Sequence, residues 1–212
     1  SYDHAHQVLD VEKAVGLFHE VPLNEYLIKH EGLITFSSYW YATAHFVVTP
    51  VVLAWLFRQR AWAYPMLRSS IVIATVSALV VYATWPLAPP RFVLGSAVTD
   101  TVMTHPVWWA KEGAAEFVNE YAAMPSLHVG WAVWCAIAVV AVLRTRWRHL
   151  AWLYPVTTTL VVAATANHYF LDAIGGTVFV LVPLWLCGLR LQHLWHGGAM
   201  LPERGDRVLL AA

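Results

Sequence analysis

The sequence predicts an all-α fold, a polytopic membrane bundle of five transmembrane helices. Hydrophobic residues make up 59% of the 212 residues and charged residues only 12%, whereas a soluble domain carries about 25% charged residues. Twelve tryptophans are present, and tryptophan favours the membrane–water boundary. Five segments without Asp, Glu, Lys or Arg are long enough, or nearly so, to cross a hydrocarbon core of about 30 Å.

In chain order these apolar segments cover residues 34–57, 69–88, 121–143, 150–171 and 173–189. Only Asp172 separates the last two. Because three of the four joints between the spans are short, we expect one bundle over residues 34–192, without a second domain. Residues 193–212 are then expected to form a cytoplasmic tail.

The distribution of the basic residues predicts which end of the bundle faces the cytoplasm. Nine of the thirteen follow the first, third or fifth span, and the positive-inside rule makes that side cytoplasmic. They are Arg58, Arg60, Arg68, Arg144, Arg146, Arg148, Arg190, Arg204 and Arg207. The remaining four lie on the outer side: Lys13, Lys29, Arg91 and Lys111. We therefore expect a multi-pass protein of the cell membrane. Its zero net charge gives no indication of a nucleic-acid partner.

Residues 1–33 precede the first span on the outer side. An apolar stripe at helical spacing predicts a first helix here, with Asp10, Glu12 and Lys13 on its other faces. The stripe consists of Val8, Val11, Val15 and Phe18. Pro22 opens a second, short helix. Two placements fit this pair, either on the outer membrane surface or against the rim of the bundle.

Residues 89–120 form a long loop, also on the outer side. Glu112, Glu116 and Glu120 lie four apart, and the simplest interpretation of this acidic stripe is a solvated helix face. Trp108 and Trp109 suit interfacial anchors. A loop of this length over a membrane bundle is suited to serve as a lid.

Side chains that carry chemistry converge at the outer end of the bundle. His128 lies near the start of the third span, in "YAAMPSLHVGWAVW". His168 and Asp172 lie between the fourth and fifth spans, in "ANHYFLDAIGG", and Arg91 follows the second span. None of them is needed to build a membrane bundle, and an ionisable side chain at membrane depth is costly.

These residue types suit phosphoryl transfer through a phosphohistidine. His168 and Asp172 are four apart, on one face of a helix, and a carboxylate on one ring nitrogen raises the nucleophilicity of the other. A second histidine, His128, supplies a general acid and base. The planar fork of Arg91 suits phosphate. Ser126 and the N–H groups that open the third helix are placed to hold phosphate oxygens.

Other interpretations of the same residues stay open. Two histidines and a carboxylate also suit a metal ion, although no further ligand cluster supports one and phosphohistidine chemistry requires no metal or other cofactor. Ser126 also suits the role of a helix cap, and Arg91 suits contact with a lipid headgroup. His45 suits either a buried hydrogen bond within the bundle or a supporting contact to the site residues. A non-enzymatic lipid-binding protein or transporter is a further alternative.

Two motifs resemble a known family. "PSLH" and "HYFLD" resemble the second and third signatures of the type 2 phosphatidic acid phosphatase superfamily, whose usual forms are Pro-Ser-Gly-His and Ser-Arg-x5-His-x3-Asp. Of the first signature, Lys-x6-Arg-Pro, only the arginine is kept, in "PPRF". The segments "APPR", "PSLH" and "NHYFLDAIGG" together resemble the inositolphosphotransferase branch, which includes fungal inositol phosphorylceramide synthase. The resemblance covers roughly residues 80–180.

The resemblance implies roles for the residues that match it. His168 is the expected nucleophile, Asp172 its orienting carboxylate and His128 the acid–base group. Arg91 and Ser126 are the expected phosphate-binding residues.

The chain also departs from the family pattern. Val161 and Val162 stand where the phosphatase signature has Ser-Arg. The family core usually has six spans, which leaves room for one upstream of Ser1. A phosphomonoester or diphosphate calls for several cations, but on the outer side only Arg91 and Lys111 are available to the site.

We therefore expect a lipid phosphotransferase that acts on a phosphodiester such as phosphatidylinositol, with a lipid alcohol as acceptor. The alternative within the superfamily is a lipid-phosphate or polyprenyl-(di)phosphate phosphatase.

Overall fold

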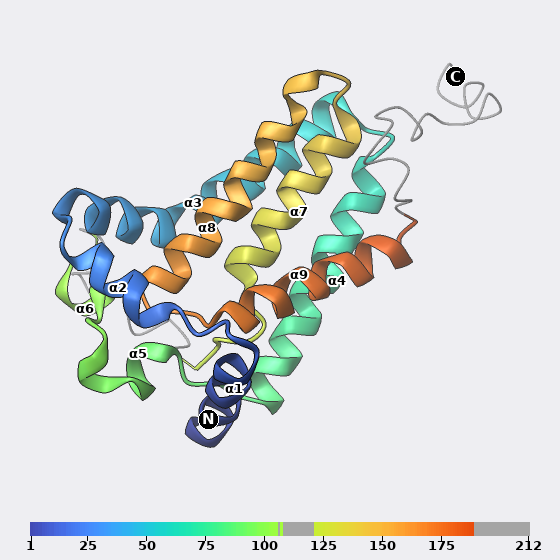
Figure 1. The fold of residues 1–212 in the computed structure, drawn as a ribbon. Helices are drawn as coiled ribbons and strands as arrows, with labels where there is room; N and C mark the ends of the chain where they lie inside the picture. Colours follow the sequence, from blue (N-terminus) through green and yellow to red (C-terminus); the bar gives the residue numbers. More distant parts are fainter. Residues whose placement is uncertain (106, 108–120, 189–212) are drawn as a thin grey trace, which may run out of the picture.

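The computed structural model describes residues 1–105, 107 and 121–188, which fold into a bundle of helices (Figure 1). In chain order the helices are α1 (Tyr2–Val15), α2 (Glu20–Ile28), α3 (Glu31–Gln59), α4 (Tyr64–Thr84), α5 (Pro90–Val93), η1 (Gly95–Ala97), α6 (Thr101–Thr104), α7 (Leu127–Val142), η4 (Arg146–Trp152), α8 (Leu153–Ala164) and α9 (Phe170–Leu186). The predicted all-α class is confirmed for these residues. Most of the second half of the expected lid, including Lys111, and the expected tail lie outside them.

The expected spans correspond to α3, α4, α7, α8 and α9. α3 and α4 are long and apolar enough to cross a membrane, whereas α7 and α9 are shorter apolar helices. Large apolar side chains cover the outside of α3 and α4, with Phe46 65%, Val51 60% and Val80 57% exposed. Apolar surface of this extent suits lipid rather than water. The chain is thus a membrane protein, and the number of crossings stays a prediction.

Two of the predicted spans are shorter than their apolar segments. α7 begins at Leu127 rather than near residue 121, because the preceding residues pair with Leu87, whose N–H donates to the Tyr121 carbonyl at 2.9 Å. α8 ends at Ala164, and residues 165–169 lead into α9. The break between the last two helices therefore precedes Asp172, which lies in the first turn of α9.

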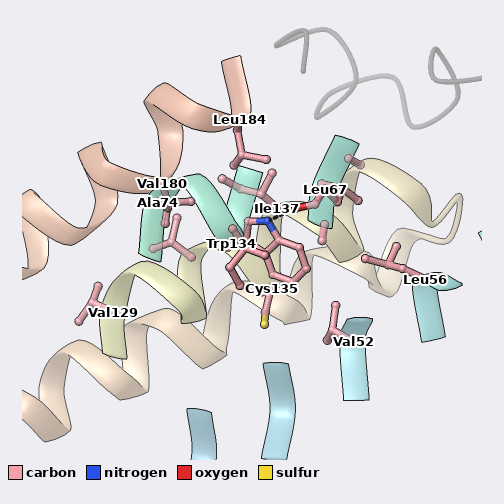
Figure 2. Packing of buried hydrophobic residues seen from close by; sticks show 14 of the residues in the cluster. Val52, Leu56, Leu67, Ala74, Val129, Trp134, Cys135, Ile137, Val180 and Leu184 are labelled. Atoms are coloured by element: carbon pink, nitrogen blue, oxygen red, sulfur yellow. Dashed lines mark hydrogen bonds between the residues drawn. The ribbon is translucent and has the colours of Figure 1, made fainter. Parts of the chain in front are cut away.

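α7 lies at the centre of the bundle and contacts α3, α4, α8 and α9. Its Trp134 is fully buried among apolar side chains such as Leu67 and Ile137 (Figure 2). The Trp134 indole N–H donates to the Ser70 hydroxyl at 3.0 Å and to the Leu67 carbonyl at 3.2 Å. This part of the interior is close-packed, with its polar indole nitrogen satisfied.

Two glycines let α9 cross closely over the start of α7. A Cβ atom on Gly176 would lie 2.1 Å from the Ser126 carbonyl oxygen, and one on Gly130 would lie 2.9 Å from the Gly176 oxygen. Because no real Cβ atom tolerates such distances, only glycine permits this approach. The approach lets the Ser126 N–H donate to the Asp172 carbonyl at 3.0 Å.

α1 and α2 pack against the rim of the bundle, at the end where α7 and α9 begin (Figure 1). The predicted apolar stripe of α1 is partly wrong, since Val11 and Val15 are 50% and 59% exposed. The buried face is rotated, because the helix packs on α5 and α9 through another set of side chains. This set is Ala5, Val8, Leu9 and Glu12. Glu12, which we expected on another face, is therefore buried.

Candidate active site

His168 lies in the short segment between α8 and α9, with only 3% of its surface exposed. Its backbone N–H donates to the Val162 carbonyl at 3.1 Å. Its ring Nδ1 lies 2.7 Å from the Ala123 carbonyl oxygen and 3.4 Å from Asp172 Oδ2. Because a carbonyl oxygen only accepts, Nδ1 carries the proton and Nε2 holds the lone pair.

Asp172 is the third residue of α9 and is fully buried. Its Oδ2 accepts the Tyr169 N–H at 2.8 Å, and the same oxygen faces the His168 ring. The prediction that His168 and Asp172 share a helix face is wrong in its geometry, because His168 precedes α9. The contact arises instead because Asp172 caps the helix and folds back on the residues before it.

His128 is the second residue of α7 and is partly buried. Its ring stacks on Tyr41 at a centroid distance of 4.3 Å and meets His45 edge-on at 4.3 Å. The His128 and His168 centroids are 5.4 Å apart, so the two rings border the same space. Sequence reasoning missed Tyr41. The spacing of four between Tyr41 and His45, which places both on one face of α3, was the signal that pointed to it.

Arg91 is the second residue of α5, and only 7% of its side chain is exposed. Its Nη1 donates to Asn167 Oδ1, its Nε lies 3.3 Å from Asp100 Oδ2, and its backbone N–H donates to the Ala166 carbonyl at 3.0 Å. Arg91 is thus tied to the segment that carries His168. Sequence reasoning did not anticipate Asp100, which partly balances the charge of Arg91.

Ser126 is fully buried at the start of α7. Its Oγ accepts the Val129 N–H at 3.4 Å, so the hydroxyl caps the helix. A phosphate contact by Ser126 stays a prediction.

An apolar pocket of about 350 Å³ lies between α3, α4 and α7. Trp131 forms part of its wall, one turn beyond His128, and donates its indole N–H to the Thr75 hydroxyl at 3.0 Å. The Trp131 and His45 ring centroids are 6.0 Å apart. The pocket therefore adjoins the histidines, and Phe46 in its wall lies on the exposed outer surface of α3. Its other lining residues are Phe46, Thr49, Pro50, Leu53, Ile71, Val72, Thr75 and Val76.

Together these groups suit nucleophilic attack and proton transfer. His168 presents a lone pair on Nε2, Asp172 supports the opposite nitrogen, and His128 lies beside them. In the part of the chain that the structure describes, no group of three His, Cys, Asp or Glu side chains is arranged to hold a metal ion.

Comparison with known protein families gives a match to the PAP2 superfamily over residues 6–186. The matched region runs from α1 to the end of α9 and includes every site residue described above. No curated protein and no solved structure matches the chain.

Proposed function

Because the chain belongs to the PAP2 superfamily, we propose that it is an integral membrane lipid phosphotransferase that works through a phosphohistidine. Membership of the superfamily points to phosphatase or phosphotransferase chemistry on lipid phosphates. The observation that carries the finer proposal is the hydrogen bond between His168 Nδ1 and the Ala123 carbonyl. This hydrogen bond directs the lone pair of Nε2 away from Asp172, and the ring of His128 lies beside that of His168.

In the first step, His168 Nε2 attacks phosphorus and the bond from phosphorus to the leaving alcohol oxygen breaks. Protonated His128 gives its proton to that oxygen. Asp172 stabilises the positive charge that develops on the His168 ring. In the second step, the acceptor hydroxyl gives its proton to His128 and attacks phosphorus, which breaks the phosphorus–nitrogen bond. Positioning and charge neutralisation supply most of the rate.

The charges around the site favour a phosphodiester donor such as phosphatidylinositol, as in the inositolphosphotransferase branch. Arg91 already interacts with Asp100, and Val161 and Val162 are buried apolar residues in place of the Ser-Arg of the phosphatase signature. A single negative charge on the donor matches this modest positive charge. Arg91 and Ser126 then hold phosphate oxygens, and the apolar pocket beside Trp131 accommodates a lipid chain.

A second candidate is hydrolysis of a lipid phosphate or polyprenyl diphosphate, with water as the acceptor. The partial exposure of His128 favours it, since water can reach the general base. The two reactions share the first step and differ in which hydroxyl reaches His128.

The reaction is proposed to take place on the outer side of the cell membrane. The turn between α3 and α4 and the helix η4 lie at the end of the bundle away from α1, α5 and the start of α9 (Figure 1). Arg58 lies in the last turn of α3, Arg60 in the turn that follows, and Arg146 and Arg148 on η4. The positive-inside rule places that end in the cytoplasm.

Mass spectrometry of lipids incubated with the purified protein tests the proposal. The mixture contains phosphatidylinositol, phosphatidic acid, a polyprenyl diphosphate and candidate lipid alcohols, and the parallel samples contain His168→Ala and His149→Ala. His149 is an exposed histidine on η4, so its variant is the matched control. A new phosphodiester made by wild type and His149→Ala but not by His168→Ala supports a transferase. Free phosphate with a dephosphorylated lipid supports the phosphatase instead, and turnover by His168→Ala contradicts the phosphohistidine.

A further inference from the structure

Two glutamates from the N-terminal helices bind the first turn of α9. Glu12 of α1 accepts the Leu171 backbone N–H through Oε1 at 2.8 Å. Glu20 of α2 accepts the Phe170 backbone N–H through Oε1 at 3.2 Å. The first N–H groups of a helix lack partners within the helix, and carboxylates at this position are favourable.

Asp172 completes the arrangement, because its own side chain accepts the N–H of Tyr169. Three consecutive backbone N–H groups are therefore held by three carboxyl groups that come from α1, α2 and α9. The Asp172 oxygen that binds Tyr169 also faces His168. The orientation of this turn thus fixes the distance between Asp172 and the expected nucleophile.

Glu12 and Glu20 are both 0% exposed, which is unusual for glutamate. A buried carboxyl group is costly unless it is hydrogen-bonded or neutral. One oxygen of each, Oε2, has no hydrogen-bond partner among the described residues. A role confined to apolar packing would be served by leucine or methionine at lower cost, so the carboxyl groups require a specific explanation.

We propose that Glu12 and Glu20 are positioning residues of the active site, which hold the first turn of α9 so that Asp172 meets His168. The inference rests on the proposed function, because it assigns them a role in the reaction of His168. Neither glutamate touches the reacting atoms. They act through Leu171 and Phe170, and a displacement of about 1 Å at a catalytic group is enough to cost about 100-fold in rate.

The arrangement is sensitive to pH. Burial raises the pKa of Glu12 to about 8, with Glu20 and Asp172 adding to the rise and the Leu171 hydrogen bond opposing it. The stabilisation from protonated Glu12 is complete below its ordinary pKa of 4.5 and is lost as the pH rises through about 8. Ionised Glu12 then repels the other two carboxyl groups and loosens the turn.

Other ionisable groups near Glu12 do not offset this repulsion. At the start of α9 the facing groups are Asp172 and the Tyr169 phenol, and from α2 it is Glu20. α5, which also packs on α1, carries Arg91, whose guanidinium already contacts Asp100 and Asn167.

The experiment compares Glu12→Ala, Glu20→Ala and Glu12→Gln with wild type and with Glu25→Gln, a change at an exposed glutamate of α2. Initial rates with the substrate pair found by mass spectrometry give kcat and KM from pH 6 to 9.5, and thermal unfolding covers pH 5 to 9. Each alanine variant is expected to lower kcat about 10- to 100-fold at pH 7, with little change in KM. Glu12→Gln keeps a hydrogen-bond acceptor but has no proton to lose. It should recover most of that loss and move the alkaline fall in kcat upward by a pH unit or more.

Two outcomes decide the inference. Rescue by Glu12→Gln with a shifted alkaline limb supports it, and Glu25→Gln should behave as wild type. If kcat falls at the same alkaline pH in Glu12→Gln as in wild type, the inference is overturned. This holds even if both alanine variants unfold at lower temperature, because a merely structural role changes the melting temperature alone. Since Glu12→Gln tests the pH profile without removing the hydrogen bond, the test survives if Glu12→Ala fails to fold. Absence of any turnover by wild type would refute the proposed function, which is a different result.

Discussion

The interior of the bundle and the end that carries the candidate active site are held by different forces. Around Trp134, α7 fits its neighbours by the shapes of apolar side chains, with one indole N–H satisfied by Ser70 and Leu67. At the end that carries the candidate active site, directed hydrogen bonds fix the starts of α7 and α9, including those from Ser126 and Tyr169 to Asp172. Apolar packing loses stability when a side chain is cut back. Hydrogen-bonded geometry can lose chemistry while the fold survives, so the two regions should respond differently to substitution.

The largest effect is expected from Asp172→Asn, at the hydrogen-bonded end. Asparagine keeps an oxygen for the Tyr169 N–H, and the Ala123 carbonyl still fixes the His168 tautomer. The variant loses the negative charge that stabilises the reacting ring, and we expect kcat to fall about 10³-fold. Initial-rate kinetics measures this, and thermal unfolding should be nearly unchanged. A kcat within tenfold of wild type would contradict the role assigned to Asp172.

The opposite response is expected from Trp134→Ala. Removing this fully buried side chain leaves a cavity and should cost about 3 kcal/mol of unfolding free energy. The folded fraction should keep its kcat, because the cavity lies away from the histidines. Denaturant titration in detergent measures the loss, and Trp147→Ala is the control, since Trp147 is 62% exposed. A fall in kcat without loss of stability would show that the two regions are coupled.

Gly176→Ala tests the joint between the two regions. The added Cβ atom would lie 2.1 Å from the Ser126 carbonyl, so the backbones must separate, at a cost of about 2 kcal/mol. Because the separation also moves Asp172, both stability and kcat should fall. In the control Gly175→Ala, the new atom meets the end of the flexible Met124 side chain at 3.3 Å. Equal behaviour of the two variants would argue against this close approach.

A smaller effect is expected from Arg91→Lys. Lysine keeps the positive charge but lacks the planar guanidinium group that contacts both Asn167 and Asp100. We expect KM for the lipid donor to rise about tenfold, which corresponds to one charged hydrogen bond of about 1.5 kcal/mol. The matched control is Arg146→Lys, at an exposed arginine of η4. An unchanged KM would remove Arg91 from the phosphate-binding residues.

No effect is expected from metal removal. The proposed reaction uses His168, His128 and Asp172 alone for bond breaking and proton transfer. Treatment with EDTA, followed by assay in metal-free buffer, should leave kcat within twofold of the untreated protein. A loss that Zn²⁺ or Mg²⁺ restores would favour the alternative that these side chains bind a metal ion.

Much of this arrangement could be predicted from the sequence. Long apolar segments predict helices directly, since a segment in lipid must form all of its backbone hydrogen bonds internally. The expected site residues His128, His168 and Asp172 lie in short motifs, and the structure brings them together. The roles of these residues stay predictions.

The contacts between distant segments could not be predicted in the same way. Asp100, which contacts Arg91, lies in an irregular connection whose sequence shows no periodicity. Glu12 and Glu20 bind residues 159 and 150 positions away, and local patterns report nothing over such distances. A signal was nevertheless present, because Glu12 lies seven residues after Ala5 and four after Val8, on the same helical face. An acidic residue on an apolar stripe indicates a buried partner.

The hydrogen bond from Leu171 to Glu12 also has a consequence for biosynthesis. The ribosome makes α1 first and α9 after every other helix described here. His168 acquires its carboxylate partner only when α9 has been made and has met α1 and α2. A nascent chain that is still entering the bilayer therefore lacks the complete set of residues proposed for catalysis. If these residues carry the proposed reaction, the surrounding lipids are protected from it until assembly is almost finished.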